Sequence, residues 1–202
     1  MTEISNISYL KFLKEIGISS FSQEKPNNFY SNDLIKQNNK IIDKIEDVKN
    51  LNDLNLLLKK DINTKKFIFG EGNENANIML IGGLPQIEDI KNLKPFFGEV
   101  GKLLDNMLSA IKLNRKEIFI THVIPRNNNE KLTNEEILKY MPFIQKKIEI
   151  INPNILLLLG PISAKTILNS NVDFENLRGK WHDYRTVNMK KTIRSVINNI
   201  KK

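Results

Sequence analysis

One stretch of the sequence, residues 70–105, gathers residue types that could bind a small ligand. It holds a short apolar run, residues 78–81, which is closed by Gly82 and Gly83. An apolar run of this length that ends in glycines predicts a buried strand followed by a sharp turn. Ligands bind to the loops that leave the carboxyl ends of strands in open α/β sheets. The segment Pro-Phe-Phe-Gly at residues 95–98 then brings an aromatic ring to the mouth of that predicted site.

The elements that would position this stretch alternate between strands and helices. Further apolar strands are predicted at residues 118–124 and 155–159, and helices at residues 100–111, 133–150 and 162–168. A capping box, Thr133 with Glu136, opens the second of these helices. Alternation of this kind indicates a parallel sheet covered by helices on both faces.

We therefore expect an α/β fold, a three-layer α/β/α sandwich with a four-stranded, mostly parallel sheet, over residues 66–202. An edge strand is expected after Trp181 and a final basic helix over residues 190–201. Residues 1–65 carry recurrent Ile and Leu among charged residues, which predicts a helical N-terminal extension that covers the domain.

The composition excludes several classes of chemistry. The chain has 202 residues, and its 31 Lys and Arg exceed its 23 Asp and Glu, which leaves a formal charge of +8. A basic surface favours anionic partners such as nucleic acid. A protein encoded by an AT-biased genome is also rich in lysine, however, and then carries the same charge without any binding role. The absence of cysteine excludes disulfides, thiolate nucleophiles and cysteine-ligated clusters. With two histidines far apart we expect no metal site, and with no signal peptide or membrane span we expect a cytoplasmic monomer.

Several short motifs, in order, resemble the type 4 uracil-DNA glycosylases. They are Gly-x-x-Pro at residues 82–85, Pro-Phe-x-Gly-x-x-Gly-x-Leu-Leu-Asp at 95–105, Ile-Thr-x-Val at 120–123 and Leu-Arg-Gly-x-Trp-His at 177–182. The resemblance runs from about Tyr9 to Lys202, and its most specific part is residues 96–105. It implies a base-excision repair protein that flips uracil out of DNA into a pocket and hydrolyses the N-glycosidic bond.

The resemblance also implies roles for individual residues. Phe96 falls on the aromatic that stacks on the base, His122 on the asparagine that reads its edge, and Asp89 on an acidic, candidate catalytic position. The base-binding residues it implies are Gly82, Gly83, Leu84, Pro85, Gln86, Phe96 and His122. The DNA-binding residues we expect are Lys165, Arg178, Lys180 and Asn128, since basic and amide side chains commonly contact phosphates. The implied partner is uracil-containing DNA.

The sequence departs from the family pattern at several places. The glutamate of the first motif falls on Gly83, and an imidazole at His122 cannot present the paired donor and acceptor of an amide. Two cysteines of the family's 4Fe-4S cluster fall on Arg126 and Tyr140, and the N-terminal pair is absent, so no cluster is expected. The family's His-Pro-x-x-Leu loop supplies a histidine hydrogen-bond donor and a side chain that wedges into the DNA, and we find no such loop in this sequence. His182 matches a different, non-catalytic position of the family.

Two hypotheses of different classes follow. The first is a divergent glycosylase, in which Asp89, His122 and Phe96 act in a rearranged pocket. The second is a non-catalytic homologue that binds DNA or another protein. Loss of an acid–base group removes about 10²–10⁴ in rate, and loss of a charge-stabilising donor removes a similar factor, so we expect weakened or lost catalysis. A weaker third hypothesis is a phosphate-binding module built on Gly82 and Gly83.

Each candidate residue also has an ordinary structural interpretation. Phe96 could pack in the core, Asp89 could be a solvated loop charge, and His122 could be a satisfied buried histidine. The basic side chains could form a solvated face. The structure must place these side chains at a common cavity for the ligand-binding interpretation to hold.

Overall fold

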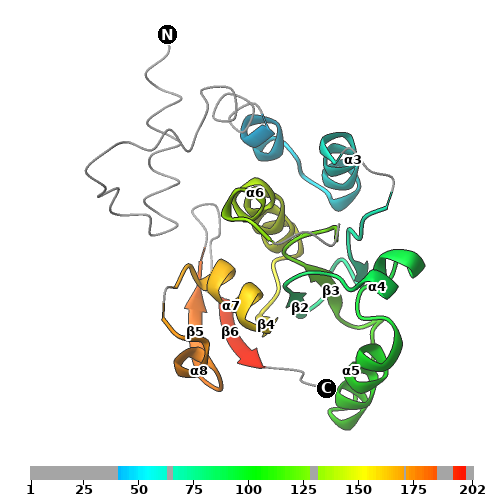
Figure 1. The fold of residues 1–202 in the computed structure, drawn as a ribbon, viewed down its shortest axis with the longest axis vertical. Coiled ribbons are helices and arrows are strands. Elements are labelled where there is room, and N and C mark those ends of the chain that lie inside the picture. The colour runs from blue at the N-terminus through cyan, green and yellow to red at the C-terminus, as the bar shows by residue number, and fades with distance from the viewer. Residues whose placement is uncertain (1–40, 63–65, 128–131, 171, 186–192, 199–202) are drawn as a thin grey trace. The chain divides into compact units, whose positions relative to one another are not determined.

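The computed structural model describes residues 41–62, 66–127, 132–170, 172–185 and 193–198 (Figure 1). Two compact units are distinguished, residues 1–48 and 49–202. In the first unit only residues 41–48 are described, and residues 41–46 of these are helical. The predicted helices before residue 41 lie outside the described residues, and the domain boundary expected at residue 65 stays a prediction.

The second unit is organised around one six-stranded sheet whose strand order is β1-β3-β2-β4-β6-β5. The strands are β1 (Glu71–Gly72), β2 (Ile78–Gly82), β3 (Phe119–His122), β4 (Ile155–Leu159), β5 (Trp181–Tyr184) and β6 (Ile193–Asn198). Adjacent strands among β3, β2, β4 and β6 are parallel, whereas β1 and β5 pair antiparallel at the two edges. The predicted α/β class with a mostly parallel sheet is confirmed, but the sheet has six strands rather than four.

Helices cover both faces of this sheet (Figure 1). The helices described in this unit are α3 (Leu51–Asp61), α4 (Ile87–Asn92), α5 (Gly98–Ala110), α6 (Asn134–Ile151), α7 (Pro161–Leu168) and α8 (Phe174–Leu177). The Thr133 side chain caps α6 by accepting from the backbone N–H of Glu136, which confirms the predicted N-cap. No helix in the described part of the chain is long and apolar enough to cross a membrane.

The C-terminal element corrects one prediction. The basic helix expected over residues 190–201 is wrong, because residues 193–198 form strand β6. This strand lies between β4 and β5, and the side chains of Ile193 and Ser195, two residues apart, are buried. Lysines and asparagines beside an apolar run read as an amphipathic helix, but pairing on both sides with other strands overrides local propensity.

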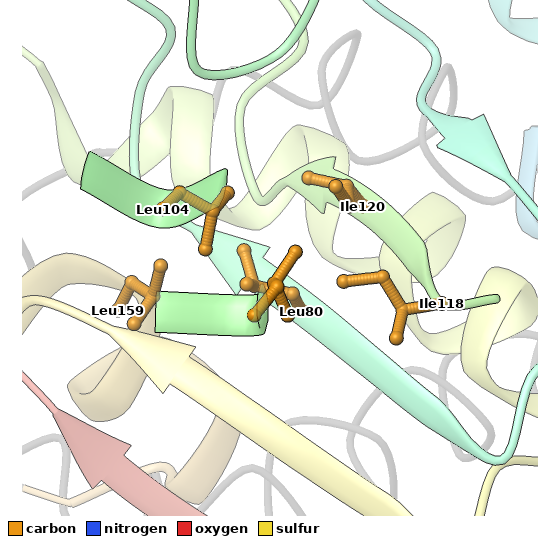
Figure 2. Close-up of a cluster of buried hydrophobic side chains, with 6 residues drawn as sticks. Leu80, Leu104, Ile118, Ile120 and Leu159 are labelled. Atoms are coloured by element: carbon orange, nitrogen blue, oxygen red, sulfur yellow. The ribbon is translucent and has the colours of Figure 1, made fainter. Parts of the chain in front are cut away.

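The core beneath the sheet joins α5 to the three central strands (Figure 2). Its buried members are Leu80, Leu104, Leu108, Ile118, Ile120 and Leu159. Since β2, β3 and β4 are parallel and in register, Gly82 is paired with both His122 and Leu159. The last residues of three strands therefore form a row at one edge of the sheet.

Candidate base-binding site

A cavity of about 300 Å³ opens at the carboxyl ends of β2, β3 and β4. It is lined by Gly82, Gly83, Leu84, Gln86, Asp89, Phe96, Val100, His122, Leu159 and Gly160. A cavity of this volume is at the small end of the range for ligand sites, roughly 300–1,000 Å³. Seven of the residues singled out from the sequence line it, namely Gly82, Gly83, Leu84, Gln86, Asp89, Phe96 and His122.

The rings of Phe96 and His122 stack on each other within this cavity. Their centroids are 4.7 Å apart and their planes differ by 21°. A Cβ atom at Gly82 would lie 2.6 Å from Cζ of Phe96 and 2.7 Å from Cδ2 of His122, so only glycine leaves room for the pair. Phe96 also packs against the apolar core, so its two interpretations from the sequence both describe part of its environment.

His122 is buried, with 2% of its surface exposed. Burial, together with the positive charge of Lys147, lowers the pKa of the imidazole to about 3, so the ring is neutral near pH 7. Its Nδ1 atom has no hydrogen-bond partner among the described residues. His122 is therefore not the fully satisfied buried histidine that the structural interpretation required.

Lys147 is a buried cation that the sequence did not predict to be part of the site. It projects from α6 and donates from Nζ to the carbonyl oxygen of Phe69 (2.5 Å) and to Oγ1 of Thr121 (3.2 Å). Nζ also lies 4.2 Å from the centroid of the Phe69 ring. Burial lowers the pKa of this lysine to about 7. A lysine in an amphipathic helix is normally predicted to be exposed to solvent, so no pattern in the sequence indicated that Lys147 is buried.

Asp89 is buried and connects two loops of the site. Its Oδ2 accepts from the backbone N–H of Gln86 (2.7 Å), which caps α4, and its Oδ1 accepts from the backbone N–H of Phe97 (2.6 Å). Burial raises the pKa of the carboxyl, against the effect of these backbone donors and of the Arg115 charge. With 2% of its surface exposed, Asp89 is not a solvated loop charge.

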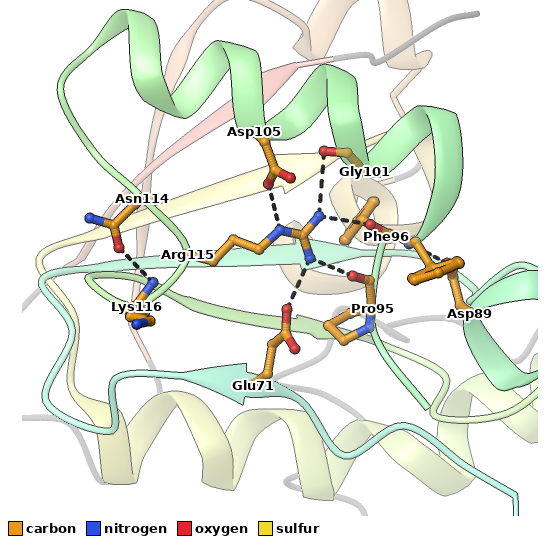
Figure 3. Close-up of polar contacts among 10 residues, drawn as sticks. Glu71, Asp89, Pro95, Phe96, Gly101, Asp105, Asn114, Arg115 and Lys116 are labelled. Carbon is orange, nitrogen blue, oxygen red and sulfur yellow. Dashed lines mark hydrogen bonds and ion pairs between the residues drawn. The ribbon is translucent and has the colours of Figure 1, made fainter. Parts of the chain in front are cut away.

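Arg115 holds the turn that carries Phe96 (Figure 3). Its guanidinium donates to the carbonyl oxygens of Pro95 (2.8 Å) and Phe96 (2.7 Å), and it pairs with Glu71 (2.9 Å) and Asp105 (2.5 Å). Phe96 has a φ of 51°, a left-handed conformation that costs a non-glycine residue roughly 1–2 kcal/mol. The contacts to the carbonyl groups on either side of this backbone stabilise the strained turn.

The loop after β3 supports the glycine loop from the other side. The backbone N–H groups of Val123 and Ile124 donate to the carbonyl oxygens of Gly82 (2.8 Å) and Gly83 (3.1 Å). Asn127 donates from Nδ2 to the carbonyl oxygen of Pro85 (2.7 Å). Pro85 is buried and does not line the cavity, while Asn128, the residue expected to touch DNA, lies outside the described residues.

The expected basic contacts lie away from the cavity lining. Lys165 is exposed on α7, which begins directly after the lining residue Gly160. Arg178 and Lys180 are exposed in the turn between α8 and β5. Strand β6 is paired with β4 up to Leu159 and Asn198, so Asn198 lies at the rim that holds the cavity.

The positions matched to cluster cysteines hold residues that do not fit an iron–sulfur cluster. Arg126 donates to Oε1 of Glu136 (2.9 Å), and Tyr140 is buried beside them, where burial raises the pKa of its hydroxyl. Such clusters are held by thiolates, and the sequence contains no cysteine. No group of three acidic, histidine or cysteine residues within the described ranges could hold a metal ion.

The class of protein that this geometry defines is an α/β protein with a cavity of about 300 Å³ at the carboxyl rim of a mostly parallel sheet. Comparison with known proteins makes this specific. The sequence profile of the uracil DNA glycosylase superfamily matches residues 69–197. The chain belongs to this superfamily, as the sequence motifs predicted.

Its relatives include several type-4 uracil-DNA glycosylases. The protein from Archaeoglobus fulgidus is 39% identical over 107 residues, which cover 51% of this chain and 53% of the relative. The protein from Saccharolobus solfataricus is 37% identical over 129 residues, covering 59% of each chain. The protein from Thermotoga maritima is 30% identical over 126 residues, covering 61% of this chain and 66% of the relative. The chain thus spans between about half and two thirds of these relatives.

Proposed function

We propose that this protein binds a uracil flipped out of DNA in the cavity at the carboxyl ends of β2, β3 and β4. The observation that carries the proposal is the cavity itself, about 300 Å³ in volume and bounded by the stacked pair Phe96 and His122. A flipped base is held by stacking on aromatic side chains and by hydrogen bonds to its edge. Both kinds of group line this cavity.

The charge of the chain supports a nucleic-acid partner. The formal charge is +8, and the exposed cations Lys165, Arg178 and Lys180 are candidates for contacts to phosphates. These residues would position the strand, and the cavity would read the base. Binding that depends on them should weaken steeply as salt is raised, by a slope that reports the number of phosphates contacted.

We further propose that excision of the base is weak or lost. Asp89 is the acidic residue among those lining the cavity, and both of its oxygens already accept backbone hydrogen bonds. It is better placed to hold the two loops together than to activate water. A neutral His122 supplies no positive charge to the leaving uracil anion, so a charge-stabilising contribution is also reduced.

Two single-residue variants test the proposed site. Fluorescence anisotropy would compare a single-stranded oligonucleotide carrying one uracil with the same strand carrying an abasic analogue. We expect F96A to weaken the uracil-dependent affinity by roughly 10- to 100-fold, because stacking contributes about 1–3 kcal/mol per base. The matched control is F97A, since Phe97 is exposed and does not line the cavity. Equal affinity of the wild-type chain for the two strands would contradict base binding.

Catalysis is tested separately on the same strands. After incubation with the protein, hot alkali cleaves any strand from which uracil has been removed. We expect little cleavage at enzyme concentrations that saturate binding. Efficient cleavage that D89N abolishes would reject the weakened-catalysis proposal and would restore the hypothesis of a divergent glycosylase in which Asp89 is catalytic.

A further inference from the structure

His122 lines the cavity, and the surroundings of its two ring nitrogens differ. Nδ1 is shielded from solvent and has no partner in the described part of the chain. A Cβ atom built at Gly82, itself a lining residue, would lie 2.7 Å from Cδ2 of His122 and 3.1 Å from Nε2. The Cδ2–Nε2 edge therefore faces the glycine loop and the cavity, and Nδ1 faces the protein.

The environment of this ring favours a neutral imidazole. One face is stacked on Phe96, whose ring offers no counter-charge, and the residue is 2% exposed. The charge of Lys147 acts on His122 from the α6 side of the sheet and opposes a second positive charge. A neutral imidazole carries one N–H donor and one lone pair, so the two nitrogens cannot both donate.

The shielded position of Nδ1 decides between the two neutral tautomers. A proton on Nδ1 would place an unpaired N–H donor inside the protein, which leaves its full desolvation cost uncompensated. Buried acceptors without partners are more common than buried donors without partners. A proton on Nε2 instead leaves only a lone pair buried and directs the donor to the cavity.

We infer that His122 carries its proton on Nε2 and donates it to a carbonyl oxygen of the base in the cavity. This inference rests on the proposed function, because it names the chemical group that the site selects. His122 is then a specificity-determining residue that reads a keto group, such as the oxygen at C4 of uracil. It offers no acceptor, so it does not read the N3–H that an amide at this position would read together with the oxygen.

A site in which His122 donates to the base should select bases differently from a site with an asparagine amide, and the difference can be measured. An amino group at C4, as in cytosine, would oppose the donor on Nε2 and be rejected. A methyl group at N3 removes an N–H that His122 does not contact, so it should be tolerated. A substitution of His122 by asparagine would supply the missing acceptor and make binding sensitive to the N3 methyl group.

The tautomer can be measured on the wild-type protein without any ligand. The chain has two histidines, and H182Q leaves His122 as the only one, so nitrogen–proton NMR correlations of labelled histidine are assigned directly. We expect a protonated Nε2 and an unprotonated Nδ1 at neutral pH. A protonated Nδ1, a charged ring or a rapid exchange between tautomers would overturn the inference.

Binding measurements test the consequence for specificity. Three strands with a hydrolysis-resistant sugar would carry uracil, N3-methyluracil or cytosine at one position, beside an abasic reference. For the wild-type chain we expect N3-methyluracil to bind within about 2-fold of uracil and cytosine to bind roughly 10-fold more weakly, the scale of one neutral hydrogen bond. For H122N we expect N3 methylation to weaken binding by roughly 10-fold, and H182Q should retain the wild-type preferences.

The possible outcomes separate this inference from the proposed function. The protein could prefer uracil over the abasic strand while N3 methylation weakens binding equally in the wild-type chain and H122N. That result would overturn the inference that His122 donates to a carbonyl oxygen and would leave the proposed function standing. Cytosine bound as tightly as uracil would also overturn it alone. Equal binding of all four strands would contradict the base-binding function and the inference about His122 together.

Discussion

Two regions of the second unit are each held by an arginine, but the two guanidinium groups bind different kinds of partner. Arg115 donates to the main-chain carbonyls of Pro95 and Phe96 and pairs with two carboxylates. Arg126, near the start of α6, pairs with the side chain of Glu136 at 2.9 Å. The first arrangement fixes the course of the backbone, and the second joins two side chains.

The difference explains how each region relates to the site. A cation that binds main-chain carbonyls on both sides of a strained residue fixes the direction of that residue's side chain, here the Phe96 ring. A pair between side chains contributes to packing without setting any ring in the cavity. Lys147 is an intermediate case, because its ammonium binds the carbonyl oxygen of Phe69 and the hydroxyl of Thr121 behind the sheet.

Removal of Arg115 should have the largest effect. R115A leaves three carbonyls and two carboxylates without their donor, so we expect the free energy of unfolding to fall by roughly 3 kcal/mol. Uracil-dependent binding should be lost as the Phe96 turn relaxes. R115K keeps the charge but has three donors in place of five, so it should restore only part of both properties. Urea unfolding measures the loss of stability, and fluorescence anisotropy measures the loss of uracil-dependent binding. If R115A folded and bound uracil as tightly as the wild-type chain, Arg115 would not differ from Arg126 in its effect on the site.

A methyl group at Gly82 should disturb the stacked pair directly. The added Cβ would lie 2.6 Å from Phe96 and 2.7 Å from His122, so we expect G82A to lower stability by about 1–3 kcal/mol. It should also abolish uracil-dependent binding. The matched variant is G83A, whose Cβ meets Ile162 at 2.8 Å instead. We expect a similar stability loss from G83A but a smaller loss of binding, and the reverse order would argue against the stacked pair as the binding platform.

The buried lysine predicts a pH dependence of stability. The pKa of Lys147 is about 7 in the folded chain and near its ordinary value of 10.5 when unfolded. Between these values the unfolded chain binds more protons, so stability should rise with pH across this window. K147M removes the titrating group and should remove this contribution to the slope. Urea unfolding at a series of pH values measures it, and an unchanged slope in K147M would contradict a depressed pKa.

The pair at Arg126 should give the smallest effect. Arg126 and Glu136 are 31% and 19% exposed, so R126Q should cost about 1 kcal/mol or less. Uracil-dependent binding should not change, in contrast to R115A. A double-mutant cycle with E136Q isolates the pair, and a coupling as large as the loss in R115A would remove the distinction between the two arginines.

The parts of the fold that could be predicted are those that local patterns encode. The apolar run that ends in two glycines is β2, the continuous run at residues 155–159 is β4, and the N-cap Thr133 begins α6. Each of these signals lies within a few residues of the element it predicts. The turn motif with Phe96 likewise led to the cavity lining, because strand ends and the loops after them share one rim in a parallel sheet.

The predictions that did not hold depended on distant partners. Residues 193–198 became a strand because β4 and β5 flank them, which no local pattern of lysines and asparagines could signal. The short β1 also joined the sheet through antiparallel pairing with β3. Strand number in a sheet is decided by pairing across the sequence, so the expected four strands became six.

The sequence by itself determined the α/β class, the family and seven of the ten residues that line the cavity, because glycine turns, caps and short motifs are written in neighbouring residues. Only the tertiary structure decided the electrostatics of the site. Arg115 and Glu71 are 44 positions apart, and Lys147 and Phe69 are 78 apart. Burial and hydrogen-bond partners arise when such distant segments pack together, and they set which groups are charged, which are neutral and which way Phe96 points.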